Sequence, residues 1–188
     1  MKTKNNRINM AAYSKYFLFC LLAISLSGCL IVRSSSSKAG KNLYETFYTE
    51  DGMQYFFKPI TFQNSDGEEL KIDFSFRNIN VETDSVIANF TIIAPSLVKE
   101  IESFRLISST STEVAGKNTQ LLFNEKKSKL YNSRFTTTLP LNGLMSMYTS
   151  TFEVVILSGQ KSYTYKPVSK TTKTVSKLNE FVFDIFRN

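Results

Sequence analysis

Of the side chains that enzymes use for acid–base or nucleophilic chemistry, histidine is absent from this sequence and cysteine is rare. Histidine is absent from the 188 residues, and the two cysteines are Cys20 and Cys29. The chain therefore lacks the commonest general base near neutral pH and the commonest metal ligand. This excludes serine–histidine and cysteine–histidine hydrolases, and no glycine-rich phosphate-binding motif occurs. We expect a protein that is not an enzyme, with no catalytic residues, no metal site and no cofactor.

Carboxylates are the remaining group that could do chemistry. Asp66, Glu68 and Glu69 lie close together, as they would in a glycosidase-like pair or a calcium loop. A calcium loop that began at Asn64 would need a bidentate glutamate at its twelfth position, where the sequence has Ser75. The residues Asn-Ser-Asp-Gly are also typical of a tight turn. We interpret these acids as part of a hairpin turn.

Four lysines late in the sequence are spaced as one face of a helix requires. They are Lys166, Lys170, Lys173 and Lys177. On a helix they would form one stripe, with Val175 and Leu178 on the far side. Such a stripe could contact an anionic membrane surface, with about 1 kcal/mol from each lysine. The alternative is a solvated linker, because Ser169 to Ser176 is rich in threonine, a weak helix former.

Aromatic residues are concentrated near the start of the predicted domain. They are Tyr44, Phe47, Tyr48, Tyr55, Phe56 and Phe57. Tyrosine and phenylalanine suit clefts that bind sugars or proteins. Packing into a core explains the same residues at least as well, and we favour the core.

The first 28 residues have the order of a secretory signal. A basic, polar segment of residues 1–15 is followed by an apolar segment from Tyr16 to Ser25. The apolar run up to Gly28 has only thirteen residues. A membrane-spanning helix needs about 20 residues, so a signal peptide fits better.

The residues that follow are Leu26-Ser27-Gly28-Cys29. They resemble the lipobox of bacterial lipoproteins, which has an aliphatic residue, two small residues and a cysteine. The resemblance covers the first 29 residues and implies that diacylglycerol is attached to Cys29 and that the chain is cleaved before it. Two or more acyl chains would hold the protein stably at a membrane, since each buried CH₂ contributes about 0.8 kcal/mol. The alternative is an ordinary signal peptide in which Ser-Gly-Cys is accidental.

Residues 29–42 are predicted to form a lipidated, flexible tether, because they contain a run of four serines and then Gly40. No aspartate follows Cys29 directly. Such an aspartate would resemble the inner-membrane retention signal of enterobacterial lipoproteins. An acidic cluster, which would resemble a surface-export signal in Bacteroidota, is also absent. These resemblances imply the periplasmic leaflet of the outer membrane, and they do not apply to a Gram-positive source.

The predicted mature chain has a smaller net positive charge than the full sequence. Four of the 23 basic residues lie in the predicted signal peptide, which has no acidic residue, so the remainder has 19 basic and 16 acidic residues. A nucleic-acid-binding protein would show a stronger and more clustered excess. The sixteen phenylalanines and nine tyrosines favour strands. The composition predicts a folded, mostly β domain that does not bind nucleic acid.

Residues 43–188 are predicted to form that domain. Leu70 to Phe76 alternates between apolar and polar residues, and Val86 to Ile92 repeats the pattern. Met53 to Gln63 is expected to be a partner strand, kinked or on an edge because of Pro59. The clearest hairpin joins Phe152–Leu157 to Ser162–Tyr165 through a short loop that contains glycine.

Further strands are expected at 104–107, 119–123 and 134–139. About seven or eight short strands suggest an immunoglobulin-like antiparallel β-sandwich, with a small barrel as the alternative. The spacing of Leu141, Leu144, Met145 and Tyr148 predicts a short helix near 141–149. The C-terminal stretch fits a helix or a strand, and we favour the helix.

The leading hypothesis is a lipid-anchored, non-enzymatic protein of the bacterial envelope. It would present a surface to another envelope component, in an accessory, assembly or immunity role, and should expose an apolar patch. One alternative is a carboxylate-dependent enzyme acting on envelope polysaccharide, which needs two acids in a cleft. Another is a carrier of a small lipid or sugar, which needs a deep apolar cavity.

Overall fold

The computed structural model describes residues 43–50, 52–78, 85–181 and 183. All of them belong to a compact unit that spans Arg33–Asn188. The predicted signal peptide, Cys29 and the tether of residues 29–42 lie outside the described residues. Among the described residues, no helix has the length and apolar character needed to cross a membrane.

The described chain is mostly strand, which confirms the prediction from composition and alternation. The strands are β1 (Tyr44–Thr49), β2 (Gly52–Phe57), β3 (Ile60–Gln63), β4 (Glu69–Asn78), β5 (Ser85–Ala94), β6 (Ser103–Ser108), β7 (Glu113–Ala115), β8 (Lys117–Lys127), β9 (Leu130–Pro140), β10 (Phe152–Ser158) and β11 (Lys161–Pro167). The helices are α2 (Leu141–Met147) and α3 (Ser169–Phe181).

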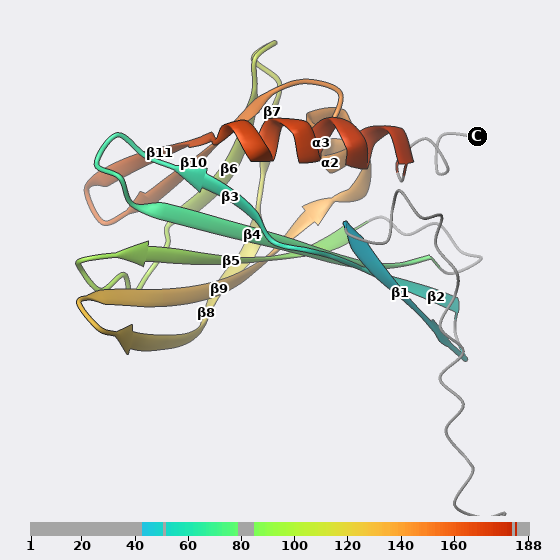
Figure 1. Ribbon diagram of the computed structural model, residues 1–188. Coiled ribbons are helices and arrows are strands. Elements are labelled where there is room, and N and C mark those ends of the chain that lie inside the picture. The colour runs from blue at the N-terminus through green and yellow to red at the C-terminus, as the bar shows by residue number, and fades with distance from the viewer. Residues whose placement is uncertain (1–42, 51, 79–84, 182, 184–188) are drawn as a thin grey trace, which may run out of the picture. The chain divides into compact units, whose positions relative to one another are not determined.

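The strands form one antiparallel sheet that nearly closes on itself (Figure 1). Neighbours follow the order β7-β6-β10-β11-β3-β4-β5-β9-β8, while β2 joins β4 and carries β1. The two ends of this order, β7 and β8, are consecutive in the chain with only Gly116 between them. Gly116 donates its N–H to the Phe104 carbonyl at 2.8 Å. A Cβ at Gly116 would collide with the Thr137 side chain, so this crossing requires glycine.

The core lies inside the curled sheet and is rich in phenylalanine. Leu70, Ile72, Phe74 and Phe76 of β4 are buried, as their alternation predicts. The ring of Phe90 on β5 stacks on Phe104 of β6, with centroids 4.5 Å apart. This contact joins parts of the sheet that are not neighbours in the ladder. Burial of each such side chain stabilises the fold by about 1.5–3 kcal/mol.

The predicted strand Met53–Gln63 is divided in two. Lys58 and Pro59 separate β2 from β3, and both strands pair with β4. Proline has no N–H to donate to a ladder, so the break falls where the sequence predicted a kink. This division, with β1 and β7, gives eleven described strands in place of about seven or eight.

Both helical predictions agree with the structure. α2 buries Leu144, Met145 and Met147. Gly143 fits there because a Cβ would come within 3.0 Å of Val114. The C-terminal stretch is helical, and α3 packs beside β3 and β11 (Figure 1).

One contact of α3 closes a gap in the sheet. β3 pairs with β11 only at Phe62 and Gln63. Beyond that point, the buried Thr171 hydroxyl of α3 donates to the Thr61 carbonyl, and the Thr61 N–H donates back to it at 3.2 Å. A side chain of the helix therefore satisfies backbone groups that a strand would otherwise pair.

Candidate functional site

β8 is the longest described strand with a neighbour on one side only, and almost all of its side chains are exposed. In the described chain it pairs with β9 alone and forms an end of the strand order. Leu121, Leu122 and Phe123 are consecutive on it and are 40%, 50% and 49% exposed. Single exposed apolar residues are ordinary, but a consecutive run of three at a sheet edge makes this strand a candidate binding surface.

Side chains on both faces of β8 are exposed along almost all of its length, and its pairing with β9 is irregular beside the apolar run. In a regular strand, successive side chains point to opposite faces of the sheet. The register of β8 against β9 shifts between Leu121 and Phe123, so Leu122 has no residue opposite it. A second shift lies between Lys117 and Gln120. Such bulges bend a strand and re-aim its side chains.

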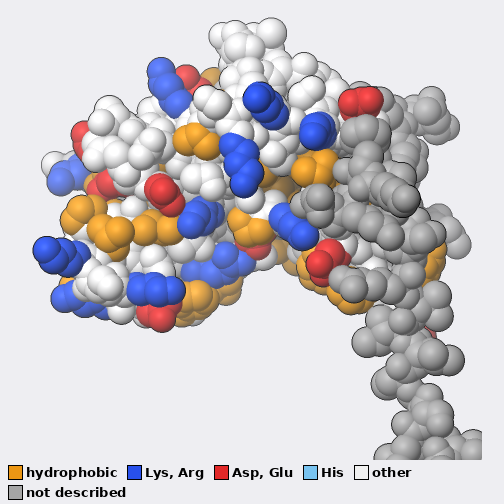
Figure 2. Space-filling view, viewed as in Figure 1, with side chains coloured by type: hydrophobic (Ala, Val, Ile, Leu, Met, Phe, Trp, Pro, Cys, Tyr) orange, Lys and Arg blue, Asp and Glu red, His pale blue; other side chains and the backbone are white. Residues whose placement is uncertain are grey.

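Positive charge surrounds this run. Lys117, Lys126, Lys127 and Lys129 lie on β8 or in the turn to β9, where Glu125 is the one acid between residues 117 and 130. Figure 2 shows lysine and arginine side chains beside apolar surface at the lower left, where Figure 1 places β8 and β9. We call Leu121, Leu122, Phe123 and the lysines Lys126, Lys127 and Lys129 the β8 edge patch.

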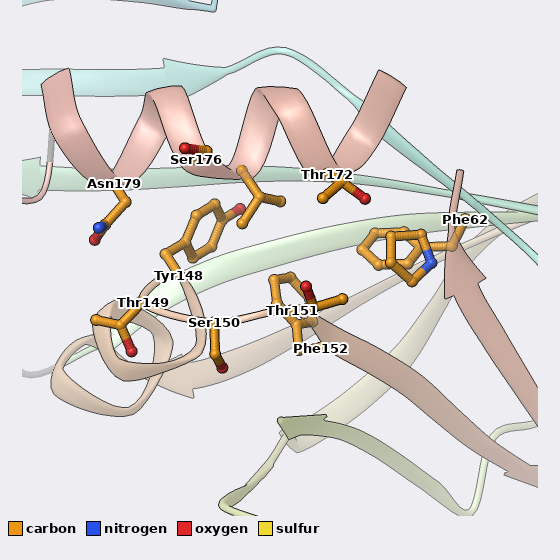
Figure 3. A pocket seen from close by; sticks show the side chains of 11 residues that line it. Phe62, Tyr148, Thr149, Ser150, Thr151, Phe152, Thr172, Ser176 and Asn179 are labelled. Atoms are coloured by element: carbon orange, nitrogen blue, oxygen red, sulfur yellow. The ribbon is translucent and has the colours of Figure 1, made fainter. Parts of the chain in front are cut away.

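A cleft of about 230 Å³ lies between α3 and the loop that follows α2. Figure 3 shows Thr172, Ser176 and Asn179 of α3 on one side of the cleft, across from the loop. The loop contributes Thr149, Ser150 and Thr151, and Phe62, Tyr148 and Phe152 lie beneath. These rings are almost completely buried, so they offer little face on which a sugar could stack. The volume is also below the roughly 300–1,000 Å³ of ordinary ligand sites.

The cleft has no pair of groups for acid–base chemistry. Tyr148 is the one titratable residue among those that line it. Burial raises the pKa of Tyr148 well above its usual value, so the phenol stays protonated. A much smaller hollow of about 10 Å³ is lined by a single carboxylate, that of Glu68. Neither space brings two acids together.

The acids near residue 66 form the predicted turn. The Asn64 side-chain oxygen accepts hydrogen bonds from the N–H groups of Asp66 and Glu68, at 3.0 and 2.9 Å. Its amide nitrogen donates to the Glu68 carboxylate at 2.8 Å, and Gly67 has φ +82°. Across the described ranges, no three acidic residues are grouped as a metal ion would need. The turn interpretation is confirmed.

The four predicted lysines do not share one helix. Lys170, Lys173 and Lys177 are exposed on α3. Lys166 lies on β11, where it is opposite Gln63 of β3 and its Nζ is 3.4 Å from Glu153 Oε1. The helical placement of Lys166 was wrong, because ladder pairing extends β11 to Pro167. Contact of these lysines with an anionic surface stays a prediction.

The aromatic cluster is part buried and part exposed. Tyr44, Tyr55 and Phe57 are buried, and the Tyr55 ring stacks on Phe76 at 5.1 Å. Burial, with Tyr44 and Tyr48 nearby, raises the pKa of Tyr55. Tyr48 and Phe56 are exposed. The core interpretation is correct for the buried members.

The β8 edge patch was not among the predicted sites. Its signal in the sequence is Leu121-Leu122-Phe123, an apolar run without alternation in a lysine-rich segment. Periodicity predicted a strand at 119–123 but could not indicate that the strand has a neighbour on one side only.

The chain matches no protein-family model, no curated protein and no solved structure. Functional conclusions therefore depend on the residues and geometry described above.

Proposed function

We propose that the protein is a lipid-anchored, non-enzymatic component of the bacterial envelope whose β8 edge patch binds another envelope protein. The observation that carries the binding role is the exposed run Leu121–Phe123 on a strand with one neighbour. The anchor is supported by the lipobox-like Leu26-Ser27-Gly28-Cys29. The proposed location is the periplasmic leaflet of the outer membrane, in an accessory, assembly or immunity role.

The immunoglobulin-like arrangement is part of this proposal. Its support is the strand order. β5 pairs with β9, and β6 pairs with β10, although three other strands lie between the members of each pair in the sequence. Hairpins join β8 to β9 and β10 to β11. Immunoglobulin-like domains likewise pair strands that are not consecutive in the sequence.

The two rival functions have weaker support. A carboxylate-dependent enzyme needs two acids about 5–10 Å apart in a cleft, and neither described space has them. A carrier of lipid or sugar needs a deep apolar cavity, whereas the cleft beside α3 is small and edged with hydroxyl groups.

Fractionation of cells tests the anchor. The protein should sediment with membranes and carry the mass of its acyl chains, and Cys29→Ser should abolish both properties. A Cys29→Ser protein that keeps the lipid mass and sediments fully would contradict the anchor.

Capture of partners from detergent-solubilised membranes tests the binding role. Leu122→Ser should remove a stoichiometric partner, while Ile87→Ser should keep it. Ile87 is the matched control because it is 51% exposed on β5, against 50% for Leu122. Equal loss with both variants, or with neither, would contradict a role for the β8 edge patch.

A further inference from the structure

We infer that β8 is the docking strand for an extended segment of a partner protein, in which apolar residues alternate with acidic ones. The segment would add to the free side of β8 as a further strand of the sheet. This inference rests on the proposed binding role of the β8 edge patch and names the chemistry of its occupant.

The first argument is the backbone of β8. From Gln120 to Lys127 it pairs with β9 on one side, and the described chain places no strand on the other. The N–H and C=O groups on that side of an edge strand form a template for another strand. Strand addition uses this template for affinity and uses alternate side chains for specificity.

The second argument is the side chains along the same edge. Leu121, Leu122 and Phe123 offer apolar contacts near the middle of β8, and Lys126 and Lys127 follow toward the turn. Opposite charges on adjacent strands stabilise pairing, whereas like charges directly opposite oppose it. An incoming strand with apolar residues beside Leu122 and carboxylates beside the lysines therefore fits best.

A second copy of this chain fits poorly. Antiparallel pairing of two β8 strands about Leu122 would place Lys117 of one copy opposite Lys127 of the other. The chain's own tether carries the wrong charge, because residues 29–42 contain Arg33, Lys38 and Lys41 and no acid. Charge complementarity thus favours a separate, acidic segment.

A membrane surface also fits less well. Backbone groups at an open sheet edge have no partners in hydrocarbon, and each unsatisfied group is costly there. Lys127 ends β8 and Lys129 lies in the turn to β9, so the apolar run is not at the tip of the hairpin. A protein strand would satisfy the edge that lipid leaves unpaired.

Edge protection is the remaining explanation for these features. Lysines and bulges often prevent edge strands from pairing with other chains. A strand whose edge is protected from pairing would have charged residues at its centre, but the centre of β8 has the three exposed apolar residues Leu121–Phe123. The lysines flank this run on the side of the turn, where they can select an acidic partner.

The test uses the purified full-length protein in detergent and a fluorescent ten-residue peptide of alternating valine and glutamate. We expect saturable binding by fluorescence anisotropy, and slower hydrogen exchange at the amides of β8 when the peptide is bound. Leu122→Ser should weaken binding about tenfold, and Ile87→Ser should leave it unchanged. Two control peptides should not bind. In the first, valine alternates with lysine. The second has the glutamate–valine sequence with every other backbone N–H methylated.

Several outcomes would overturn the inference. They are no binding of the glutamate–valine peptide, equal binding of its N-methylated form, or slower exchange on strands other than β8. Binding of anionic phosphatidylglycerol vesicles by the Cys29→Ser chain, lost in Leu122→Ser, would assign the patch to the membrane. Leu122-dependent dimerisation would assign it to a second copy. If capture of a partner still depends on Leu122 while the peptide test fails, the proposed function stands and strand addition is wrong.

Discussion

β4 and β8 are strands of similar length with opposite surroundings. β4 has ten residues and pairs on both sides, with β5 on one and with β2 and β3 on the other. β8 has eleven residues and pairs with β9 alone. The apolar residues of β4 alternate and are buried, whereas those of β8 are consecutive and exposed. The same residue types stabilise the fold in one strand and remain available to a partner in the other.

The largest expected difference is between two phenylalanines. Phe74 on β4 is buried, and its ring centroid is 6.0 Å from that of Tyr148. Phe123 on β8 is 49% exposed. Phe74→Ala should lower the free energy of unfolding by about 3–5 kcal/mol, and Phe123→Ala should change it by about 0.5 kcal/mol or less. Urea denaturation measures both. Similar losses in the two variants would show that β8 contributes to the core.

High pH should destabilise the side of the core that contacts β4. Burial raises the pKa of Tyr148, so above about pH 10 tyrosine loses its proton in the unfolded chain but keeps it in the folded one. Stability is full below that pH and falls as the pH rises, by at most about 1.4 kcal/mol per pH unit for this group. Tyr148→Phe should reduce the slope without removing it, because burial also raises the pKa of Tyr55 and of Tyr165. An unchanged slope in Tyr148→Phe would contradict this prediction.

The outer face of β4 carries a smaller, polar contribution. Arg134 Nη2 of β9 is 2.8 and 2.7 Å from the two carboxylate oxygens of Asp73, and its Nη1 donates to Thr91 at 3.0 Å. This network joins three adjacent strands and is only partly exposed. Asp73→Asn should lower the free energy of unfolding by about 1–2 kcal/mol.

The matched control for Asp73→Asn is another acid on β4. Glu69 Oε2 is 3.5 Å from Lys71 Nζ, and both side chains are more than two-fifths exposed. Glu69→Gln should cost less than about 0.5 kcal/mol in thermal or urea unfolding. Equal effects of the two substitutions would mean that the Arg134 network adds no stability.

The smallest expected effect concerns an edge that is closed by a helix. Thr171→Val removes the hydroxyl that bonds both backbone groups of Thr61, at nearly constant side-chain volume. It should lower the free energy of unfolding by about 1 kcal/mol. Hydrogen exchange at the Thr61 amide should also become faster. The neighbouring Thr172→Val is the control, because Thr172 is exposed at the cleft and should have no such effect.

Local features of the fold were predictable, and the candidate site was not. The alternation from Leu70 to Phe76 predicted β4, and Pro59 predicted the interruption between β2 and β3. The helix in α3 was predictable from spacing, but Lys166 was placed on it wrongly, since its strand depends on pairing with β3. The β8 edge patch was missed because its exposure depends on the absence of a second neighbouring strand in the described sheet.

The sequence by itself determined most of the strand segments, the turn near Asp66 and the short helix after Pro140, and that histidine is missing. Those properties depend on residue type and on neighbours a few positions away. Only the tertiary structure decided that Leu70 is buried while Leu122 is exposed. Burial depends on which distant segments pair with a strand and cover it, and the local spacing of residues does not specify those segments.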